Sequence, residues 1–134
     1  MAGRRFEGKV GVVTGGASGI GEAIVRRLVD EGARVVAGDI NRDRLAKLEA
    51  ELGGNVVGVI ADVTRESDVE AMVATAVERF GGLDVAFNVA GAARGSAVVD
   101  LSESDWDFTI DLVLKGVYLS TKHEARQMKA AGVR

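Results

Sequence analysis

Thr14-Gly15-Gly16-Ala17-Ser18-Gly19-Ile20-Gly21 joins a Val-rich run at residues 9–14 to a helix-period segment that starts at residue 19. A pyrophosphate binds the free N–H groups at a helix N-terminus when the preceding turn is tight and no side chain blocks its approach. Gly15 permits the sharp exit from the strand, Gly19 opens the helix, and Gly21 allows helix and strand to pack closely. Ser18 and Ile20 would line the phosphate path. The stretch therefore predicts a turn that binds a dinucleotide.

The spacing of these glycines narrows the kind of nucleotide. It is Gly-x-x-x-Gly-x-Gly, which differs from the commoner Gly-x-Gly-x-x-Gly. No Lys-Ser or Lys-Thr pair follows, so the stretch lacks the residues with which a P-loop holds a nucleoside triphosphate. The alternative that remains is a glycine-rich turn that binds no ligand.

Apolar segments of two kinds alternate along the chain and indicate its architecture. Short Val-rich runs, typical of strands covered on both faces, occupy residues 9–14, 34–39, 55–61 and 83–88. Helix-period segments follow them at residues 19–31, 42–52, 65–80 and 103 to about 131. Right-handed crossovers between parallel strands then predict one α/β domain over residues 1–134. It would be a Rossmann-type doubly wound parallel sheet in the order 3-2-1-4, with helices on both faces.

Local signals support the predicted helices. Gly32, Gly53 and Gly81 each follow a helix, where a residue with positive φ is needed. Ser102-x-x-Asp105 is typical of a capping box at the start of the last helix. The third helix should bury one apolar stripe, made of Val69, Met72, Val73, Ala76, Val77 and Phe80. The last helix is apolar on more than one face and carries the series Trp106, Ile110, Val113, Val117 and Thr121.

Composition excludes several classes of function. The 17 basic and 20 acidic residues give a net charge of −3, with no basic field for nucleic acid. The absence of cysteine excludes disulfides and thiolate chemistry, and a single histidine leaves no His-based cluster, so no metal is expected. No run approaches the roughly 18 apolar residues of a membrane span, and no signal-peptide pattern follows the basic N-terminus. We therefore expect a cytoplasmic protein without membrane contact.

Asp39 ends the second predicted strand and bears on the choice of cofactor. A carboxylate there accepts hydrogen bonds from both hydroxyls of an adenosine ribose and repels a 2′-phosphate, which favours NAD over NADP. Ile40 belongs to the same predicted site. Arg42 raises the opposite possibility, although Asp39 offsets its charge. A surface aspartate in a turn is the alternative.

Two further strand ends supply candidate residues. Asp62-Val63 ends the third strand, where the carboxylate would accept from the adenine amino group. A phosphoacceptor role for Asp62 would need an acidic pair after the first strand, where Thr14-Gly15-Gly16 stands instead. Asn88-Val89-Ala90-Gly91 closes the fourth strand. The Asn88 amide can hold strand ends together, and Ala90 and Gly91 leave room for a cofactor, although a turn without function is equally compatible.

With these elements in order, the chain resembles the short-chain dehydrogenase/reductase family from residue 6 to about residue 134. Thr14-Gly15-x-x-x-Gly19-x-Gly21 matches the family's cofactor signature, and Ile110-Asp111-x-x-Leu114-x-Gly116 extends the resemblance to the last helix. The resemblance implies an NAD-dependent oxidoreductase that transfers hydride between nicotinamide and a small alcohol or carbonyl substrate. The implied cofactor-binding residues are Gly15, Ser18, Gly19, Ile20, Gly21, Asp39, Ile40, Asp62, Val63, Asn88, Ala90 and Gly91.

Departures from the family concern catalysis. The family's catalytic Asn is Val113 in this chain, and a valine cannot hold the water that links the catalytic lysine to solvent. The family's Asn-Asn-Ala-Gly is Asn88-Val89-Ala90-Gly91. Family members are longer, and their catalytic Ser and Tyr-x-x-x-Lys belong to a fifth strand and helix that would follow Arg134. The resemblance therefore implies an incomplete domain without catalytic residues.

Several residues of the last predicted helix could have a functional role, but we expect structural roles for them. Tyr118 and Lys122 stand four residues apart, but on the helix before the expected catalytic one, so we expect packing at a helix or subunit contact. We expect His123 on a solvated face and Trp106 as an anchor at the helix start. The acidic group nearby complements the helix N-terminus and consists of Glu103, Asp105 and Asp107.

The sequence thus predicts that a 134-residue chain alone is inactive, and a non-catalytic or degenerate NAD-binding module is the alternative function. The fourth strand would be a sheet edge and the last helix would lack a partner, which exposes apolar surface and favours a homo-oligomer. The loop Ala92-Ala93-Arg94-Gly95-Ser96 supplies one wall of the family's substrate cleft, so it does not specify the substrate.

Overall fold

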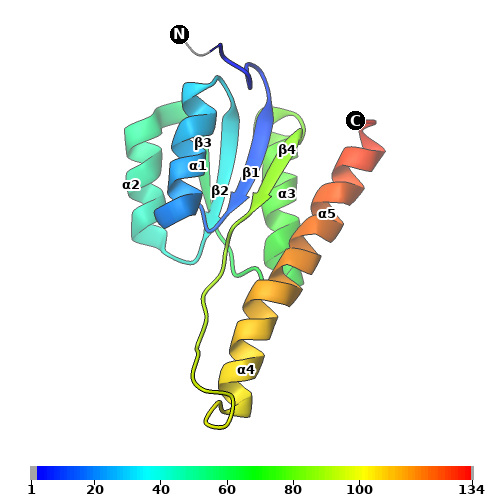
Figure 1. The fold of residues 1–134 in the computed structure, drawn as a ribbon. Coiled ribbons are helices and arrows are strands. Elements are labelled where there is room, and N and C mark those ends of the chain that lie inside the picture. Colours follow the sequence, from blue (N-terminus) through cyan, green and yellow to red (C-terminus); the bar gives the residue numbers. More distant parts are fainter. Residues whose placement is uncertain (1–2, 134) are drawn as a thin grey trace.

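The structure is a computed structural model and describes residues 3–133. Its centre is a parallel sheet in the order β3-β2-β1-β4, as predicted (Figure 1). The strands are β1 (Val10–Thr14), β2 (Arg34–Asp39), β3 (Val56–Ile60) and β4 (Val85–Asn88). Thr14 is the register partner of Gly38 on one side and of Asn88 on the other. The carboxyl ends that carry the candidate residues therefore meet at one edge of the sheet.

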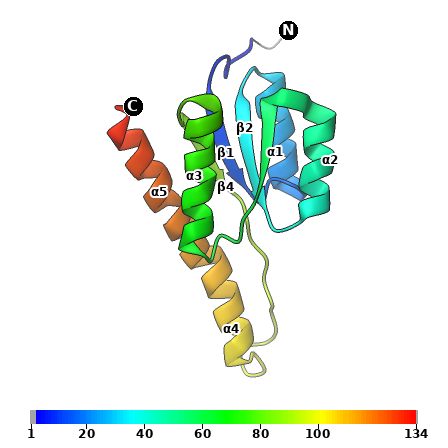
Figure 2. The ribbon, with the colours of Figure 1, turned by 180° about the vertical axis from the view of Figure 1, so that it is seen from behind.

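Helices cover both faces of the sheet. The helices α1 (Gly19–Asp30) and α2 (Arg42–Leu52) lie on one face, and α3 (Glu66–Phe80) lies on the other, beside α5 (Gly116–Ala130) (Figures 1 and 2). Strand residues alternate between the two cores: Val13 and Val35 pack toward α1 and α2, whereas Val12 and Val36 pack toward α3. The near-continuous apolarity of these strands follows from this double burial.

The predicted segments end within two residues of the observed elements, apart from the last helix. The three glycines predicted to follow helices have φ values of +96° at Gly32, +65° at Gly53 and +90° at Gly81. A short 3-10 helix, η1 (Gly53–Asn55), follows α2 and was not predicted. Ser102 caps the last helical region, because its Oγ accepts the backbone N–H of Asp105 at 3.2 Å. These signals depend on local geometry alone, which explains why the sequence revealed them.

The last predicted helix consists of three parts. Helix α4 (Glu103–Ile110) continues into a π-helical turn, η2 (Asp111–Lys115), and then into α5 (Figure 1). A π turn adds a residue to the turn and rotates the face that follows it. The residues that α5 buries are accordingly Gly116, Leu119, Ser120, His123 and Glu124. The exposed apolar residues of this region are Trp106, Val113, Leu114, Val117 and Tyr118.

Three expectations for single side chains were wrong. Trp106 is 55% exposed, so it does not anchor the helix start in a core. His123 is buried, not solvated, because the π turn directs its face toward α3. Val77 lies outside the buried stripe of α3 and lines an open groove between α3 and α5.

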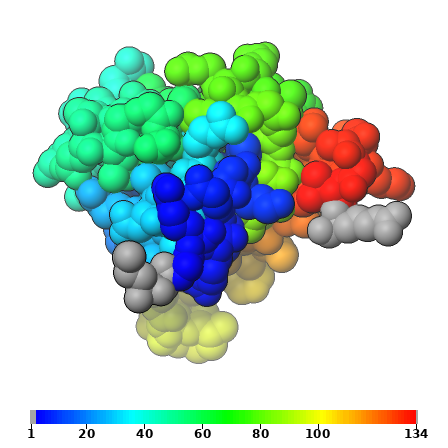
Figure 3. All heavy atoms as spheres, turned by 90° about the horizontal axis from the view of Figure 1, so that it is seen from above, coloured from blue at the N-terminus to red at the C-terminus, as the bar shows by residue number. Residues whose placement is uncertain are grey.

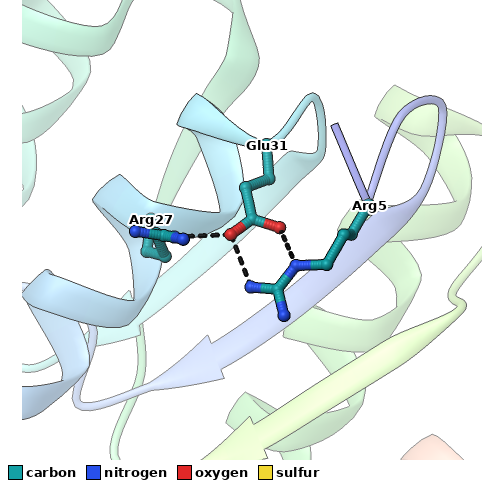
Figure 4. Close-up of polar contacts among 3 residues, drawn as sticks. All are labelled: Arg5, Arg27 and Glu31. Atoms are coloured by element: carbon teal, nitrogen blue, oxygen red, sulfur yellow. Dashed lines mark hydrogen bonds and ion pairs between the residues drawn. The ribbon is translucent and has the colours of Figure 1, made fainter. Parts of the chain in front are cut away.

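The N-terminal segment is tied to the end of α1 by one carboxylate. The side chain of Glu31 is buried and accepts from Arg5 Nε at 2.5 Å, Arg5 Nη2 at 2.6 Å and Arg27 Nε at 2.5 Å (Figure 4). Hydrogen bonds from Arg5, which has the larger effect, and from Arg27 lower the pKa of Glu31 to about 2. Figure 3 looks onto the edge at which the strands begin, and the N-terminal residues in blue lie across it. Within residues 3–133, no helix is both long enough and apolar enough to cross a membrane.

Candidate functional site

A cleft of about 670 Å³ opens at the carboxyl edge of the sheet. Its walls come from the turn after β1, the ends of β2 and β3, the segment after β4, and the junction of α4 with the π turn. Every residue predicted to bind cofactor lines this cleft except Asn88. The cleft is also lined by residues that were not predicted, namely Ala61, Thr64, Val89, Ala92, Phe108, Asp111 and Leu112.

The glycine-rich turn needs its glycines for two different reasons. Gly15 has φ +66°, and a Cβ there would lie 2.8 Å from the Cα of Ala90, so the turn touches the segment after β4. A Cβ on Gly21 would lie 1.9 Å from the carbonyl oxygen of Gly15. The close packing predicted for Gly21 is therefore against the turn itself and not against the strand.

The start of α1 faces the cleft with its backbone open. Gly19 has φ +54°, and a Cβ there would meet no atom of the described residues within 4 Å. Ser18 is the N-cap, but within residues 3–133 its side chain accepts no capping hydrogen bond. The first N–H groups of a helix have no partner inside the helix. They are thus available to an anion in the cleft.

Thr14 joins the ends of two strands behind this turn. Its side chain is buried, and its Oγ1 accepts the backbone N–H groups of Val89 at 3.0 Å and Ala90 at 3.2 Å. These bonds hold the segment after β4 against the turn after β1. The sequence indicated Thr14 only as a member of the motif, because its partners are distant along the chain.

Asp39, the predicted ribose-binding carboxylate, lies beside the glycine-rich turn. Its Oδ2 accepts the backbone N–H of Ala17 at 3.1 Å, and its Oδ1 accepts that of Asn41 at 3.0 Å. These bonds fix the orientation of the carboxylate, and its further lone pairs are available in the cleft. Arg42 is exposed at the first residue of α2.

Asp62 forms a tight turn at the end of β3. Its Oδ1 accepts from the backbone N–H of Thr64 at 2.9 Å and from Thr64 Oγ1 at 2.7 Å. Its own backbone N–H donates to Asp68 Oδ2 at 2.9 Å, which links the turn to α3. The second oxygen of Asp62 takes no part in these bonds, so it can accept from a group in the cleft.

Asn88 turns away from the cleft and contacts α5. Its Nδ2 lies 3.4 Å from Thr121 Oγ1. Within the described part of the chain, its buried Oδ1 has no hydrogen-bond partner, and neither do Ser120 Oγ or both carboxyl oxygens of Glu124. Burial raises the pKa of Glu124, and the nearby Asn88 amide partly offsets this shift. Asn88 thus joins β4 to α5 and does not line the cleft, although it was expected to hold strand ends together and to belong to the cofactor site.

Val113, the residue at the family's catalytic Asn position, lies next to Gly91 but is not among the residues that line the cleft. It belongs to the π turn, and its Cγ2 would lie 3.7 Å from a Cβ on Gly91. Its side chain is partly exposed and has no polar atom. The side chain at this position therefore cannot donate a hydrogen bond.

Tyr118 and Lys122 do not line the cleft. Tyr118 is 59% exposed, and Lys122 Nζ pairs with Glu66 Oε1 at 2.6 Å, which ties α5 to α3. The Nε2 of His123 lies 2.8 Å from the same oxygen and 3.6 Å from Glu70 Oε1. The sequence did not predict this cluster, because its members come from two helices that are distant along the chain. The hydrogen bonds from Lys122, which has the larger effect, and from His123 lower the pKa of Glu66 to about 2.

Comparison with known proteins gives a consistent result. The sequence model of the family described as short chain dehydrogenase matches residues 9–133. Momilactone A synthase from Oryza sativa subsp. japonica is 47% identical over 132 residues, which are 96% of this chain and 48% of that protein. A 3-oxoacyl-[acyl-carrier-protein] reductase from Thermotoga maritima is 42% identical over 121 residues, which are 88% of this chain and 49% of that protein.

A solved structure supports the same assignment. The crystal structure of a short chain dehydrogenase from Bacillus anthracis matches with a TM-score of 0.89 and 29% identity, over 94% of this chain and 52% of that chain. The chain spans about half the length of the curated relatives that it matches. Sequence, motif positions and fold all agree. The chain belongs to the short chain dehydrogenase family.

Proposed function

We propose that this chain binds NAD in the cleft at the carboxyl edge of the sheet. It would be the cofactor-binding half of an NAD-dependent oxidoreductase that acts on an alcohol or carbonyl substrate. The observation that carries the proposal is the meeting of the open N-terminus of α1 with the Asp39 carboxylate in one cleft. An anion site and a ribose acceptor thus lie side by side, as a dinucleotide requires.

Each part of the cofactor has residues suited to it. The N–H groups at the start of α1 would hold the pyrophosphate, and Asp39 would accept from the ribose hydroxyls. Asp62 would accept from the adenine amino group. Ile20 and Ile40 line the cleft and are more than 70% exposed, so they offer apolar surface to flat groups. Bound NAD would supply the hydride-accepting nicotinamide.

A titration of this chain with NAD and NADP by calorimetry tests the proposal. We expect NAD to bind more tightly, because Asp39 repels a 2′-phosphate. In Asp39→Ala, NAD binding should weaken about tenfold or more, since hydrogen bonds to charged groups contribute about 1.5–3 kcal/mol, and the preference for NAD should disappear. Tighter binding of NADP by the unmodified chain would refute the assignment of Asp39.

A non-catalytic NAD-binding module is the second candidate, and Val113 favours it. This residue of the π turn has no polar side-chain atom where the family resemblance implies an asparagine. Tyr118 and Lys122, which have the spacing of the family's catalytic pair, lie outside the cleft. We therefore expect the 134-residue chain to bind NAD without oxidising alcohols. Turnover by a sample of verified mass would contradict this expectation.

We also propose that the chain self-associates. The apolar side chains exposed along α4, the π turn and α5 support this proposal, because exposed apolar residues that share a helical region favour association. Sedimentation velocity at several concentrations tests it. A single monomeric species at all concentrations would contradict it.

A further inference from the structure

The segment between β4 and α4 contributes to the wall of the cleft on the β4 side, which β1 separates from Asp39 on β2. It runs as an extended connection alongside α4 (Figures 1 and 2) and is exposed from Gly91 to Asp100. Ala92, in its first part, lines the cleft. An exposed connection of this length holds a defined wall only if specific contacts attach it to the rest of the molecule.

Arg94 supplies those contacts with both its backbone and its side chain. Its backbone N–H donates to Thr109 Oγ1 at 3.0 Å. Its guanidinium carbon lies 3.8 Å from the centre of the Phe108 ring, and Nη1 lies 3.7 Å from Asp105 Oδ1. Asp105, Phe108 and Thr109 are three and four residues apart on α4, so they share one face. Arg94 therefore holds the segment along a single face of that helix.

The stack on Phe108 connects this contact to the cleft. The ring of Phe108 lies under the guanidinium, and Phe108 itself lines the cleft together with Ala92. A planar guanidinium covers an aromatic face, whereas a lysine ammonium is a point charge that does not cover the ring. Losing the stack would free the Phe108 ring and leave the backbone bond to Thr109 Oγ1 as the main attachment of the segment at Arg94.

We infer that Arg94 is a positioning residue. It fixes the shape of the cleft where the nicotinamide would bind, because it holds Phe108 and the connection of residues 91–100, which contains Ala92, in place. The inference rests on the proposed function. If Asp39 on β2 takes the adenosine ribose, the nicotinamide lies toward β4, because the sheet order places β1 between β2 and β4. Arg94 acts through its neighbours and does not need to touch the cofactor.

Calorimetry with NAD and with ADP-ribose, which lacks only the nicotinamide, tests the inference on the 134-residue chain. In Arg94→Ala we expect NAD to bind roughly three- to tenfold more weakly, while ADP-ribose changes less than about twofold. Arg94→Lys should resemble Arg94→Ala, since the stack and not the charge matters. Asp105→Asn is the matched control, because it removes the ion pair, keeps the stack and should leave both affinities unchanged.

A thermodynamic cycle adds a readout that a general loosening of the fold would not reproduce. Phe108→Leu should weaken NAD as Arg94→Ala does, and the double variant should be no weaker than either single variant, because both remove the same stack. Equal losses for NAD and ADP-ribose, additive losses in the double variant, or unchanged NAD affinity in Arg94→Ala would overturn the inference. An unmodified chain that binds both ligands equally well would overturn it too. An unmodified chain that binds neither ligand would instead refute the proposed function.

Discussion

The two walls of the cleft differ in how firmly they are built. The wall formed by β1, β2 and α1 rests on side chains that are almost completely buried, among them Val13, Val25 and Val35. On the opposite side, β4 has no fully buried residue, and neither has α4. Helix α5 does pack, but three of its buried residues are polar, namely Ser120, His123 and Glu124. The half of the cleft assigned to adenosine is therefore rigid, whereas the opposite half depends on a few specific contacts.

The charged groups show the same contrast. Glu31, at the end of α1, is buried and bonded to two arginines, so its pKa falls to about 2 and it stays ionised at neutral pH. Glu124, on α5, is buried without a hydrogen-bond partner among the described residues, and burial raises its pKa. A buried carboxylate is stable when charges and donors compensate it, and unfavourable when they do not. The α5 side thus contains a buried carboxyl group without compensating donors, which lowers the stability of the fold.

Truncation of one leucine on each side should give the largest difference. Leu28 on α1 is 3% exposed, so Leu28→Ala should lower the free energy of unfolding by about 2–5 kcal/mol through lost burial and a cavity. Leu114 in the π turn is 64% exposed, and Leu114→Ala should change it by less than about 0.5 kcal/mol. Urea denaturation measures both. Similar losses in the two variants would show that the contrast in packing is wrong.

Adding a methyl group to the glycine-rich turn should have a smaller effect on stability and a large one on binding. In Gly21→Ala, the new Cβ would meet the Gly15 carbonyl oxygen at 1.9 Å, so the turn must shift, at a cost of about 1–3 kcal/mol. Calorimetry should then detect no NAD binding. At Gly82 a Cβ meets no described atom within 4 Å, so Gly82→Ala is the control and should bind NAD normally. Normal NAD binding by Gly21→Ala would contradict the assigned turn.

Removing the charge of Glu124 should give the most pH-dependent change. Its folded pKa is raised, so the protonated form suits the folded state and stability falls as pH rises from the unfolded pKa through the folded pKa. Glu124→Gln should therefore match the unmodified chain at pH 4 and exceed it by about 1–3 kcal/mol at pH 8. Urea denaturation at both pH values measures this. The control Glu78→Gln, at an exposed position, should show no gain in stability at pH 8. If Glu124→Gln also showed no gain, the Glu124 carboxyl group would not be unpaired in the folded chain.

Most of the fold could be predicted from the sequence because its signals are local. Val-rich runs, glycines after helices and the Ser102 cap each depend on a few neighbouring residues, and the strand order follows from right-handed crossovers. The π turn could not be predicted, because a steady helical period was assumed through Val113 and Val117. The shifted register explains why His123, which follows the π turn, is buried. Trp106 precedes the π turn and lies on α4, which has no buried residue, so it is not an anchor.

The candidate site was predictable where its residues follow the carboxyl ends of strands. The turn from Gly15 to Gly21, Asp39 and Asp62 all lie at strand ends, so their meeting follows from a parallel sheet. Thr14 as the link to Val89 and Ala90, and Phe108 in the cleft, depend on contacts between distant segments. Such contacts leave no periodic signal in the sequence. The family resemblance implied Asn88 for the cofactor site, but its position on β4 does not reveal that its side chain contacts Thr121 on α5.

Mapping of backbone amide shifts by NMR during a titration with NAD tests the proposed site most directly. We predict saturable shifts at residues 15–21, at Asp39, at residues 62–64 and at residues 90–92, with little change in the groove between α3 and α5. No saturable shifts, or shifts confined to that groove around Val73 and Arg126, would contradict an NAD site at the carboxyl edge of the sheet.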